Sequence, residues 1–196
     1  MKLAFRSVAA LSVALLLQAC ATRPPPLPGH VWSGRLAVRT DAAPDVPARS
    51  MSGEFELSGN ASSGQLVLTS PIGTTIARAR WSDPVGMQGT PSKIELEADG
   101  GTRRYATLED MMQRAIGDQL PLAAMFDWLD GRPWPAAPVE RGADGRSFDQ
   151  LGWHVDLSQL ADNRLIDAQR PRPRPVLHVR VKLDAAEPAA SAASAS

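Results

Sequence analysis

Four stretches of the chain alternate apolar and polar residues, and this alternation predicts β-strands. Residues 32–39, 51–57, 93–98 and 176–183 each place apolar or small side chains at every second position, with mostly polar residues between them. A period of two with one polar face is typical of an antiparallel strand that is buried on its other face. The predicted buried faces consist of Trp32, Gly34, Leu36, Val38, Met51, Gly53, Phe55, Leu57, Ile94, Leu96, Leu177, Val179, Val181 and Leu183.

Residues 66–81 (LVLTSPIGTTIARARW) predict a hairpin that breaks sharply at Ser70-Pro71-Ile72-Gly73. Serine, proline and glycine at the first, second and fourth positions match a type I turn. A type II turn would need a positive φ at Ile72, which a β-branched residue resists. An isoleucine therefore occupies the hairpin tip, where Asn, Asp or Gly is usual. The turn alone leaves two alternatives open: Ile72 folds back to close the core, or it projects into solvent.

The hydrophobic period changes between residues 107 and 131, which predicts two short helices. Thr107 is a good N-cap for the first, and Gly117 ends it. Pro121 opens the second, and Gly131 ends it. The apolar positions at helical spacing are Leu108, Met111, Met112, Ala115 and Ile116 in the first helix, and Leu122, Met125, Phe126 and Leu129 in the second.

The rest of the chain predicts further strands and loops. Residues 147–150 and 153–157 return to a strand pattern, whereas residues 162–174 are densely charged and are expected to form a loop. Asp99-Gly100-Gly101 predicts a tight turn between two strands. These elements indicate an α+β fold, an antiparallel sheet of nine to eleven short strands with helices inserted midway. A sheet of this size curls strongly, so its apolar face lines a concavity that the two helices can cover.

The N-terminus predicts a targeting signal and a lipid anchor. Lys2 and Arg6 precede an apolar run over residues 8–17 that is too short to cross a bilayer, as in a signal peptide. The run ends in Leu17-Gln18-Ala19-Cys20, which resembles the lipobox of bacterial lipoproteins. We therefore expect residues 1–19 to be removed and Cys20, the only cysteine of the chain, to be lipid-modified. Residues 20–30 are a Pro-rich tether, residues 31–183 the folded domain, and residues 184–196 an Ala/Ser-rich disordered tail.

Composition excludes several classes of protein. The signal holds two of the 21 basic residues and none of the 21 acidic ones, so the mature chain has 19 basic residues and a net charge of −2. This balance argues against a nucleic-acid partner. A single cysteine cannot form an internal disulfide, so the fold must depend on its core.

Candidate catalytic chemistry is absent from the sequence. His30, His154 and His178 have no metal-ligand partner at helical spacing, and the chain contains neither a Gly-x-Ser-x-Gly elbow nor a phosphate-binding loop. We therefore predict that the protein is not an enzyme and has no metal or cofactor. Met111, Met112 and Met125 are adaptable side chains of the kind found in hydrophobic grooves, although ordinary core packing is the favoured explanation of these methionines taken alone.

Several motifs occur in an order that resembles one family. After the lipobox and the tether come W-x-G-R-L-A-V (residues 32–38), L-x-L-T-x-P-I-G (66–73), L-P-L-x-x-x-x-x-W-L-x-G (120–131) and G-W-x-V (152–155). The series is similar to the LolB family of outer-membrane lipoproteins, which receive other lipoproteins from the periplasmic carrier LolA and insert them into the outer membrane. The resemblance covers about residues 31–183. It departs at residues 54–57, which lack an expected tryptophan, and in the Arg/Pro-rich residues 169–175.

The resemblance implies a fold, a site and partners. The implied fold is a strongly curved, incomplete β-barrel with a short helical lid over a hydrophobic cavity. The implied membrane-insertion loop is Pro71, Ile72 and Gly73, with Ile72 protruding. The implied acyl-chain lining is Leu36, Val38, Phe55, Leu57, Leu66, Leu68, Ile94, Leu96, Met111, Met112, Met125, Phe126 and Leu129.

The same resemblance implies a monomer that faces the periplasm. It would be anchored in the outer membrane by Cys20, where Ala21 differs from the aspartate associated with retention in the inner membrane. Its implied partners are LolA and the acyl chains of the lipoprotein cargo, without nucleic acid. The alternative is an anchored lipoprotein that binds a lipid or a partner without transferring it.

Overall fold

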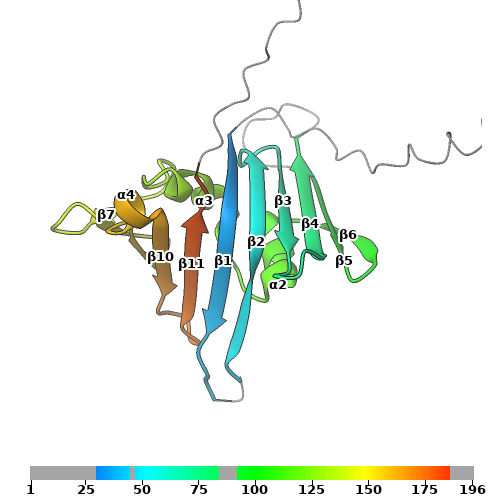
Figure 1. Ribbon diagram of the computed structural model, residues 1–196, viewed down its shortest axis with the longest axis horizontal. Helices are drawn as coiled ribbons and strands as arrows, with labels where there is room; N and C mark the ends of the chain where they lie inside the picture. Colours follow the sequence, from blue (N-terminus) through cyan, green and yellow to red (C-terminus); the bar gives the residue numbers. More distant parts are fainter. Residues whose placement is uncertain (1–29, 45–46, 84–91, 186–196) are drawn as a thin grey trace, which may run out of the picture.

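A computed structural model describes residues 30–44, 47–83 and 92–185. It contains one antiparallel sheet of 11 strands in the order β6-β5-β4-β3-β2-β1-β11-β10-β9-β8-β7, with three helices (Figure 1). The strands are β1 Val31–Thr40, β2 Arg49–Gly59, β3 Gly64–Thr69, β4 Thr75–Ser82, β5 Lys93–Ala98, β6 Gly101–Tyr105, β7 Glu140–Arg141, β8 Ser147–Gln150, β9 Trp153–Asp156, β10 Leu165–Arg170 and β11 Leu177–Leu183. The helices are α2 Leu108–Ile116, α3 Leu122–Leu129 and α4 Leu160–Asn163. The predicted signal, most of the predicted tether, residues 84–91 and the predicted tail from residue 186 lie outside the described residues.

The first and last strands meet in the middle of the sheet. Leu36 of β1 pairs with Val181 of β11, and each half of the chain then continues outward strand by strand. The sheet therefore has two edge strands, β6 and β7, and remains open instead of closing into a barrel. The prediction of an antiparallel sheet is confirmed. The 11 strands observed equal the upper limit of the predicted nine to eleven.

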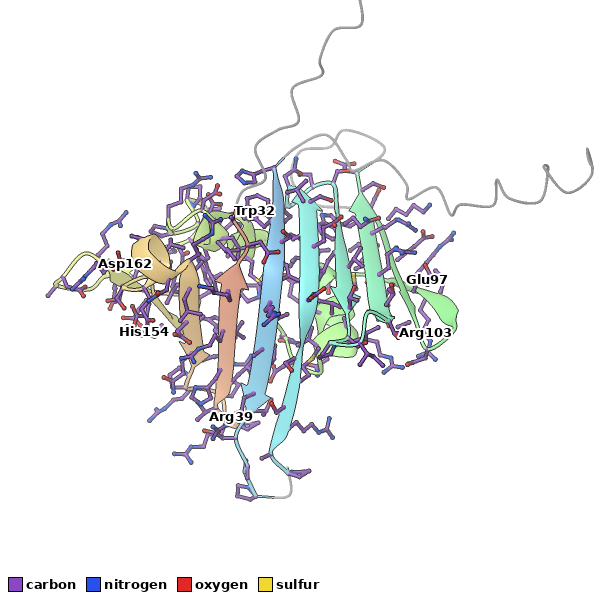
Figure 2. All side chains as sticks on the ribbon, viewed as in Figure 1. Trp32, Arg39, Glu97, Arg103, His154 and Asp162 are labelled. Carbon is purple, nitrogen blue, oxygen red and sulfur yellow. The ribbon has the colours of Figure 1, made fainter. Side chains whose placement is uncertain are left out.

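The predicted strand faces are those that the structure buries. Along β1, the side chains of Trp32, Leu36 and Val38 are buried, whereas Arg35 is exposed. The opposite face of the sheet is polar and carries ion pairs between neighbouring strands (Figure 2). Examples are Arg180 Nε with Asp167 Oδ1 at 2.7 Å and Arg104 Nε with Glu95 Oε1 at 3.1 Å. This division of the two faces follows directly from the period of two.

One sequence prediction was wrong: residues 162–174 are not a continuous loop. They include the end of α4 and all of β10, in which Ile166 and Ala168 are buried. Asp167 lies between them and binds Arg180 on the outer face. The charges that suggested a loop belong to that outer face, and they obscured a short alternating pattern. The two-residue strand β7 was also not predicted.

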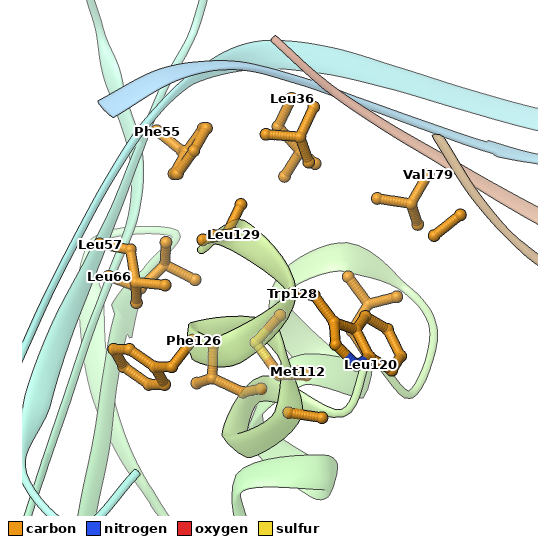
Figure 3. Packing of buried hydrophobic residues seen from close by; sticks show 14 of the residues in the cluster. Leu36, Phe55, Leu57, Leu66, Met112, Leu120, Phe126, Trp128, Leu129 and Val179 are labelled. Atoms are coloured by element: carbon orange, nitrogen blue, oxygen red, sulfur yellow. The ribbon is translucent and has the colours of Figure 1, made fainter. Parts of the chain in front are cut away.

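The two predicted helices form where capping signals placed them. The backbone N–H of Asp110 donates to Thr107 Oγ1 at 3.1 Å, and Gly117 adopts a left-handed conformation with φ +89° at the end of α2. Pro121 directly precedes α3. Both helices lie against the concave face of the sheet, and Figure 3 shows the strands arching over α3. We call α2, α3 and residues 117–121 between them the helical cover.

Gly34 permits a close approach of β1 to β11. A Cβ atom at this position would lie 2.1 Å from the backbone oxygen of Lys182. We expect Gly34→Ala to lower the free energy of unfolding by about 1–3 kcal/mol, because one strand must shift to relieve the clash. Urea denaturation checks this value. Gly101→Ala is the matched control: its Cβ meets no atom within 4 Å, so its effect should stay within about 0.5 kcal/mol.

Candidate functional site

The β3–β4 turn is a rigid three-residue loop. The backbone N–H of Gly73 donates to Ser70 O at 2.9 Å, and the N–H of Ser70 donates to Thr74 O at 2.8 Å. The Ser70 hydroxyl also accepts from the N–H of Thr74 at 3.1 Å. With φ +85° at Gly73, this is a type I turn followed by a left-handed glycine, a common hairpin loop. The predicted type I turn is confirmed.

Ile72 projects into solvent at the tip of this turn. Its side chain is 88% exposed, whereas the other large apolar residues classed as exposed reach 37–47%. Pro71 and Gly73 beside it are exposed as well. The alternative in which Ile72 closes the core is therefore excluded. Transfer of such a side chain out of water is worth about 1.5–3 kcal/mol, so the turn presents a substantial apolar contact.

The residues expected to line an acyl cavity are brought together, but in a packed interior. Twelve of them are buried, and Met125 packs against them while partly exposed. The buried ones are Leu36, Val38, Phe55, Leu57, Leu66, Leu68, Ile94, Leu96, Met111, Met112, Phe126 and Leu129.

Among the described residues, the apolar pocket that remains beside the helical cover measures only about 20 Å³. That is room for about one water molecule, so the interior is closed to an acyl chain in this conformation. The pocket is lined by Leu120, Pro121, Met125, Trp128, Leu129, Trp153, Ile166, Ala168, Val179 and Val181.

Trp128 and Gln150 were not among the predicted site residues, and they hold α3 to the sheet. Gln150 is buried, and its Oε1 accepts from Trp128 Nε1 at 3.0 Å and from the backbone N–H of Trp134 at 2.9 Å. Its Nε2 donates to Trp134 O at 2.8 Å. Trp32 Nε1 on β1 donates to Asp130 Oδ1 just beyond α3 at 3.2 Å. A signal for Trp128 exists, because a helix that is apolar on nearly every side is expected to be buried.

The other part of the helical cover is held by ion pairs. Arg170 Nη2 at the end of β10 donates to Asp118 Oδ1 at 2.8 Å, and both side chains are largely buried. The guanidinium also lies 5.7 Å from the centroid of the Trp153 ring. Arg170 Nε is buried without a hydrogen-bond partner among the described residues. A buried donor left unpaired costs about 1–3 kcal/mol, so this contact is less stable than a fully bonded one.

The turns of the sheet fall at two opposite ends. We call one the Ile72 end; it comprises the β1–β2, β3–β4, β5–β6, β8–β9 and β10–β11 connections. We call the other the Val31 end, where β1 begins and β11 finishes. Asp118 contacts the sheet at the Ile72 end through Arg170. Arg114 of α2 does so through Asp99 in the β5–β6 turn.

His154 and His178 lie on the polar face of the sheet. His154 Nδ1 lies 3.0 Å from Asp149 Oδ1, and His178 Nε2 lies 3.3 Å from Asp41 Oδ2. The hydrogen bond with His178 lowers the pKa of Asp41 below its ordinary value, and Arg39 lowers that pKa further. In the described ranges no three His, Cys, Asp or Glu residues are grouped to hold a metal ion. None of the helices described is both long and apolar enough to cross a membrane.

Together these features define an open, curved antiparallel sheet whose apolar face is covered by helices and whose turns present one fully exposed isoleucine. The chain belongs to the LolB family: a family model described as outer membrane lipoprotein LolB matches residues 30–185. It is 35% identical over 168 residues to the outer-membrane lipoprotein LolB of Thiobacillus denitrificans, covering 78% of this chain and 83% of the relative. It is 32% identical over 182 residues to that of Bordetella bronchiseptica (86% and 84%) and 28% over 171 residues to that of Chromobacterium violaceum (85% and 88%).

Proposed function

We propose that this protein accepts lipoproteins from the periplasmic carrier LolA, holds their acyl chains under the helical cover, and inserts them into the outer membrane. The observation that carries the proposal is the exposed Ile72 at the tip of a rigid turn. Neither the core nor the turn geometry requires an isoleucine there, whereas contact with a bilayer does. In this proposal the protein is a monomer that faces the periplasm and is anchored through Cys20.

The physical need for such a protein is large. Exposing an acyl chain to water costs about 0.8 kcal/mol per methylene, so a chain of about fifteen methylenes costs about 12 kcal/mol. A lipoprotein with several chains cannot leave one apolar site and reach another through water at a useful rate. The chains must instead pass between protected interiors, and transfer runs downhill from carrier to receiver to bilayer.

The packed interior requires the helical cover to move before chains can enter. The far end of α3 is held by the bond of Trp32 to Asp130 at the Val31 end and by the bond of Trp128 to Gln150 beside the β8–β9 turn, so it is the less mobile part. The α2 helix packs Leu108, Met111 and Met112 into the core, and α2 and residues 117–121 are also tied to the sheet by ion pairs at the Ile72 end. We infer that the cover opens there, and that Met111, Met112 and Met125 adapt to the entering chains because thioether side chains repack easily.

A transfer assay tests the function. A purified complex of LolA with a radiolabelled lipoprotein is mixed with this protein and phospholipid vesicles, and the label is followed into each fraction. We expect the label to move from LolA to this protein when vesicles are absent, and into the vesicles when they are present. Label that remains with LolA would refute the proposal. Label that reaches this protein but never the vesicles would support the alternative, an anchored binding protein without transfer activity.

A further inference from the structure

A second apolar side chain occupies a hairpin tip, in the β8–β9 turn. Gln150 pairs with Trp153 across this turn, and the two residues between them, Leu151 and Gly152, have φ +55° and +77°. Two consecutive positive φ values in a two-residue hairpin loop define a type I′ turn. The Leu151 side chain is 47% exposed.

Neither the turn nor the core accounts for a leucine at this position. A left-handed conformation disfavours leucine, while Asn-Gly is the pair that type I′ turns prefer. The flanking residues Gln150 and Trp153 are both buried, so the arms are fixed and the tip is held rigidly outward. A strained, half-exposed leucine on fixed arms points to a function outside the fold.

Leu151 lies at the same end of the sheet as Ile72, and the connection next to its turn carries unpaired positive charge. The β10–β11 connection, next to the β8–β9 turn, contributes the exposed residues Arg172 and Arg174, which have no ion-pair partner among the described residues. Three acidic residues of this end are already paired. Asp41 binds Arg39 and His178, Asp99 binds Arg114, and Asp118 binds Arg170.

We propose that the Ile72 end is a contact surface for an anionic phospholipid bilayer, in which Ile72 and Leu151 insert at two separate points while Arg172 and Arg174 bind the phosphate headgroups. The proposal rests on the proposed function, in which Ile72 meets the membrane, and adds a second insertion point and a charge preference. Two separated apolar points, one of them with cations in the neighbouring connection, orient a protein on a surface, whereas one point leaves it free to tilt. The ion pairs of the helical cover lie at the same end, so a cover that opens by breaking them would open toward the bilayer.

The length of the tether permits this orientation. A chain anchored at Cys20 enters the sheet at the Val31 end, and β1, ten residues long, spans about 33 Å. The eleven residues 20–30 can span at most about 36–40 Å. The anchor can therefore lie in the same leaflet that the Ile72 end touches.

The test uses the mature chain carrying Cys20→Ala, so that no lipid anchor masks the contact, and vesicles of phosphatidylcholine alone or mixed equally with phosphatidylglycerol. Leu151→Asn should weaken binding to both vesicle types by about tenfold, while raising the melting temperature by about 2–4 °C through relief of strain. Arg172→Gln with Arg174→Gln should weaken binding to the anionic vesicles alone, by about tenfold or more, and reduce its salt dependence.

Matched controls lie at the Val31 end. Val31→Asn changes a side chain that is 42% exposed, and Arg80→Gln with Lys182→Gln removes the same charge as the arginine pair; neither should alter vesicle binding. If the Leu151 and arginine variants bind vesicles as the wild type does, the proposed contact surface is wrong. It is also wrong if Leu151→Asn unfolds, because Leu151 would then serve the fold. Transfer of label from LolA is measured in parallel without vesicles. If wild-type protein fails there yet binds vesicles through these residues, the proposed function fails and the surface stands.

Discussion

Ile72→Glu should leave the fold and the acceptance of lipoprotein intact and abolish delivery into vesicles. The side chain makes no core contact that the substitution could remove, since it is 88% exposed. The turn is held by the backbone of residues 70–74 and the Ser70 hydroxyl, which the change leaves in place. The variant loses an apolar insertion worth about 1.5–3 kcal/mol and must in addition keep a carboxylate out of the bilayer. The transfer assay measures acceptance from LolA when vesicles are absent and delivery when they are present.

Two variants control this prediction. Ile72→Leu preserves the apolar volume and should deliver at close to the wild-type rate. Val31→Glu adds the same charge at an exposed apolar residue of the opposite end and should also deliver normally. The prediction is wrong if Ile72→Glu delivers normally, or if its melting temperature drops markedly, since the isoleucine would then contribute to the fold.

Covalently joining residues 118 and 170 should abolish acceptance of lipoprotein. In the Cys20→Ala background, Asp118→Cys with Arg170→Cys places the only two cysteines where the native side chains lie 2.8 Å apart. Because cysteine is much shorter than the arginine that it replaces, a short bismaleimide with a disulfide in its linker is used to join the two sulfur atoms and tie the helical cover to β10. Because the interior pocket of about 20 Å³ admits no acyl chain, a closed cover leaves no place for the cargo. Reduction of the disulfide should restore transfer from LolA in the same sample.

The converse change should act in the opposite direction. Asp118→Asn removes the charge that pairs with Arg170 and weakens a contact worth about 2 kcal/mol, so acceptance should become faster, by up to about tenfold. The matched control is Asp167→Cys with Arg180→Cys, a pair at 2.7 Å that joins β10 to β11 on the outer face without touching the cover. Cross-linking this pair should have no effect. Acceptance by the locked 118–170 protein at the wild-type rate would show that chains enter elsewhere.

These predictions concern a single end of the molecule. The Ile72 turn, the Leu151 turn, Arg172 and Arg174, and the ion pair that holds the cover all lie there. The firm attachment of α3 through Trp32 and Asp130 lies at the other end. A protein that must release apolar chains into a bilayer without exposing them to water gains from this arrangement, since its opening and its membrane contact then coincide.

Local features of this protein were determined by the sequence alone. The period of two identified the buried faces of β1, β2, β5 and β11, and the capping residues Thr107 and Gly117 placed α2. The order Ser-Pro-Ile-Gly gave the turn type and put Ile72 at its tip. Each of these depends on hydrogen bonds and steric limits within a few residues, which is why short stretches of sequence are enough.

Only the tertiary structure decided the rest. It decided which way Ile72 points, how closely the interior is packed, and that the charged residues 162–174 contain the strand β10. Each of these depends on what lies opposite a residue in the folded chain. Arg170 and Asp118 are 52 residues apart in the chain, and no local pattern relates them. In the sequence, Leu151 is an ordinary apolar residue. Only the pairing of Gln150 with Trp153 shows that it occupies a hairpin tip in a left-handed conformation. Such contacts depend on the order of the strands in the sheet and on the dense packing of many side chains at once. The local pattern of apolar and polar residues carries no information about either.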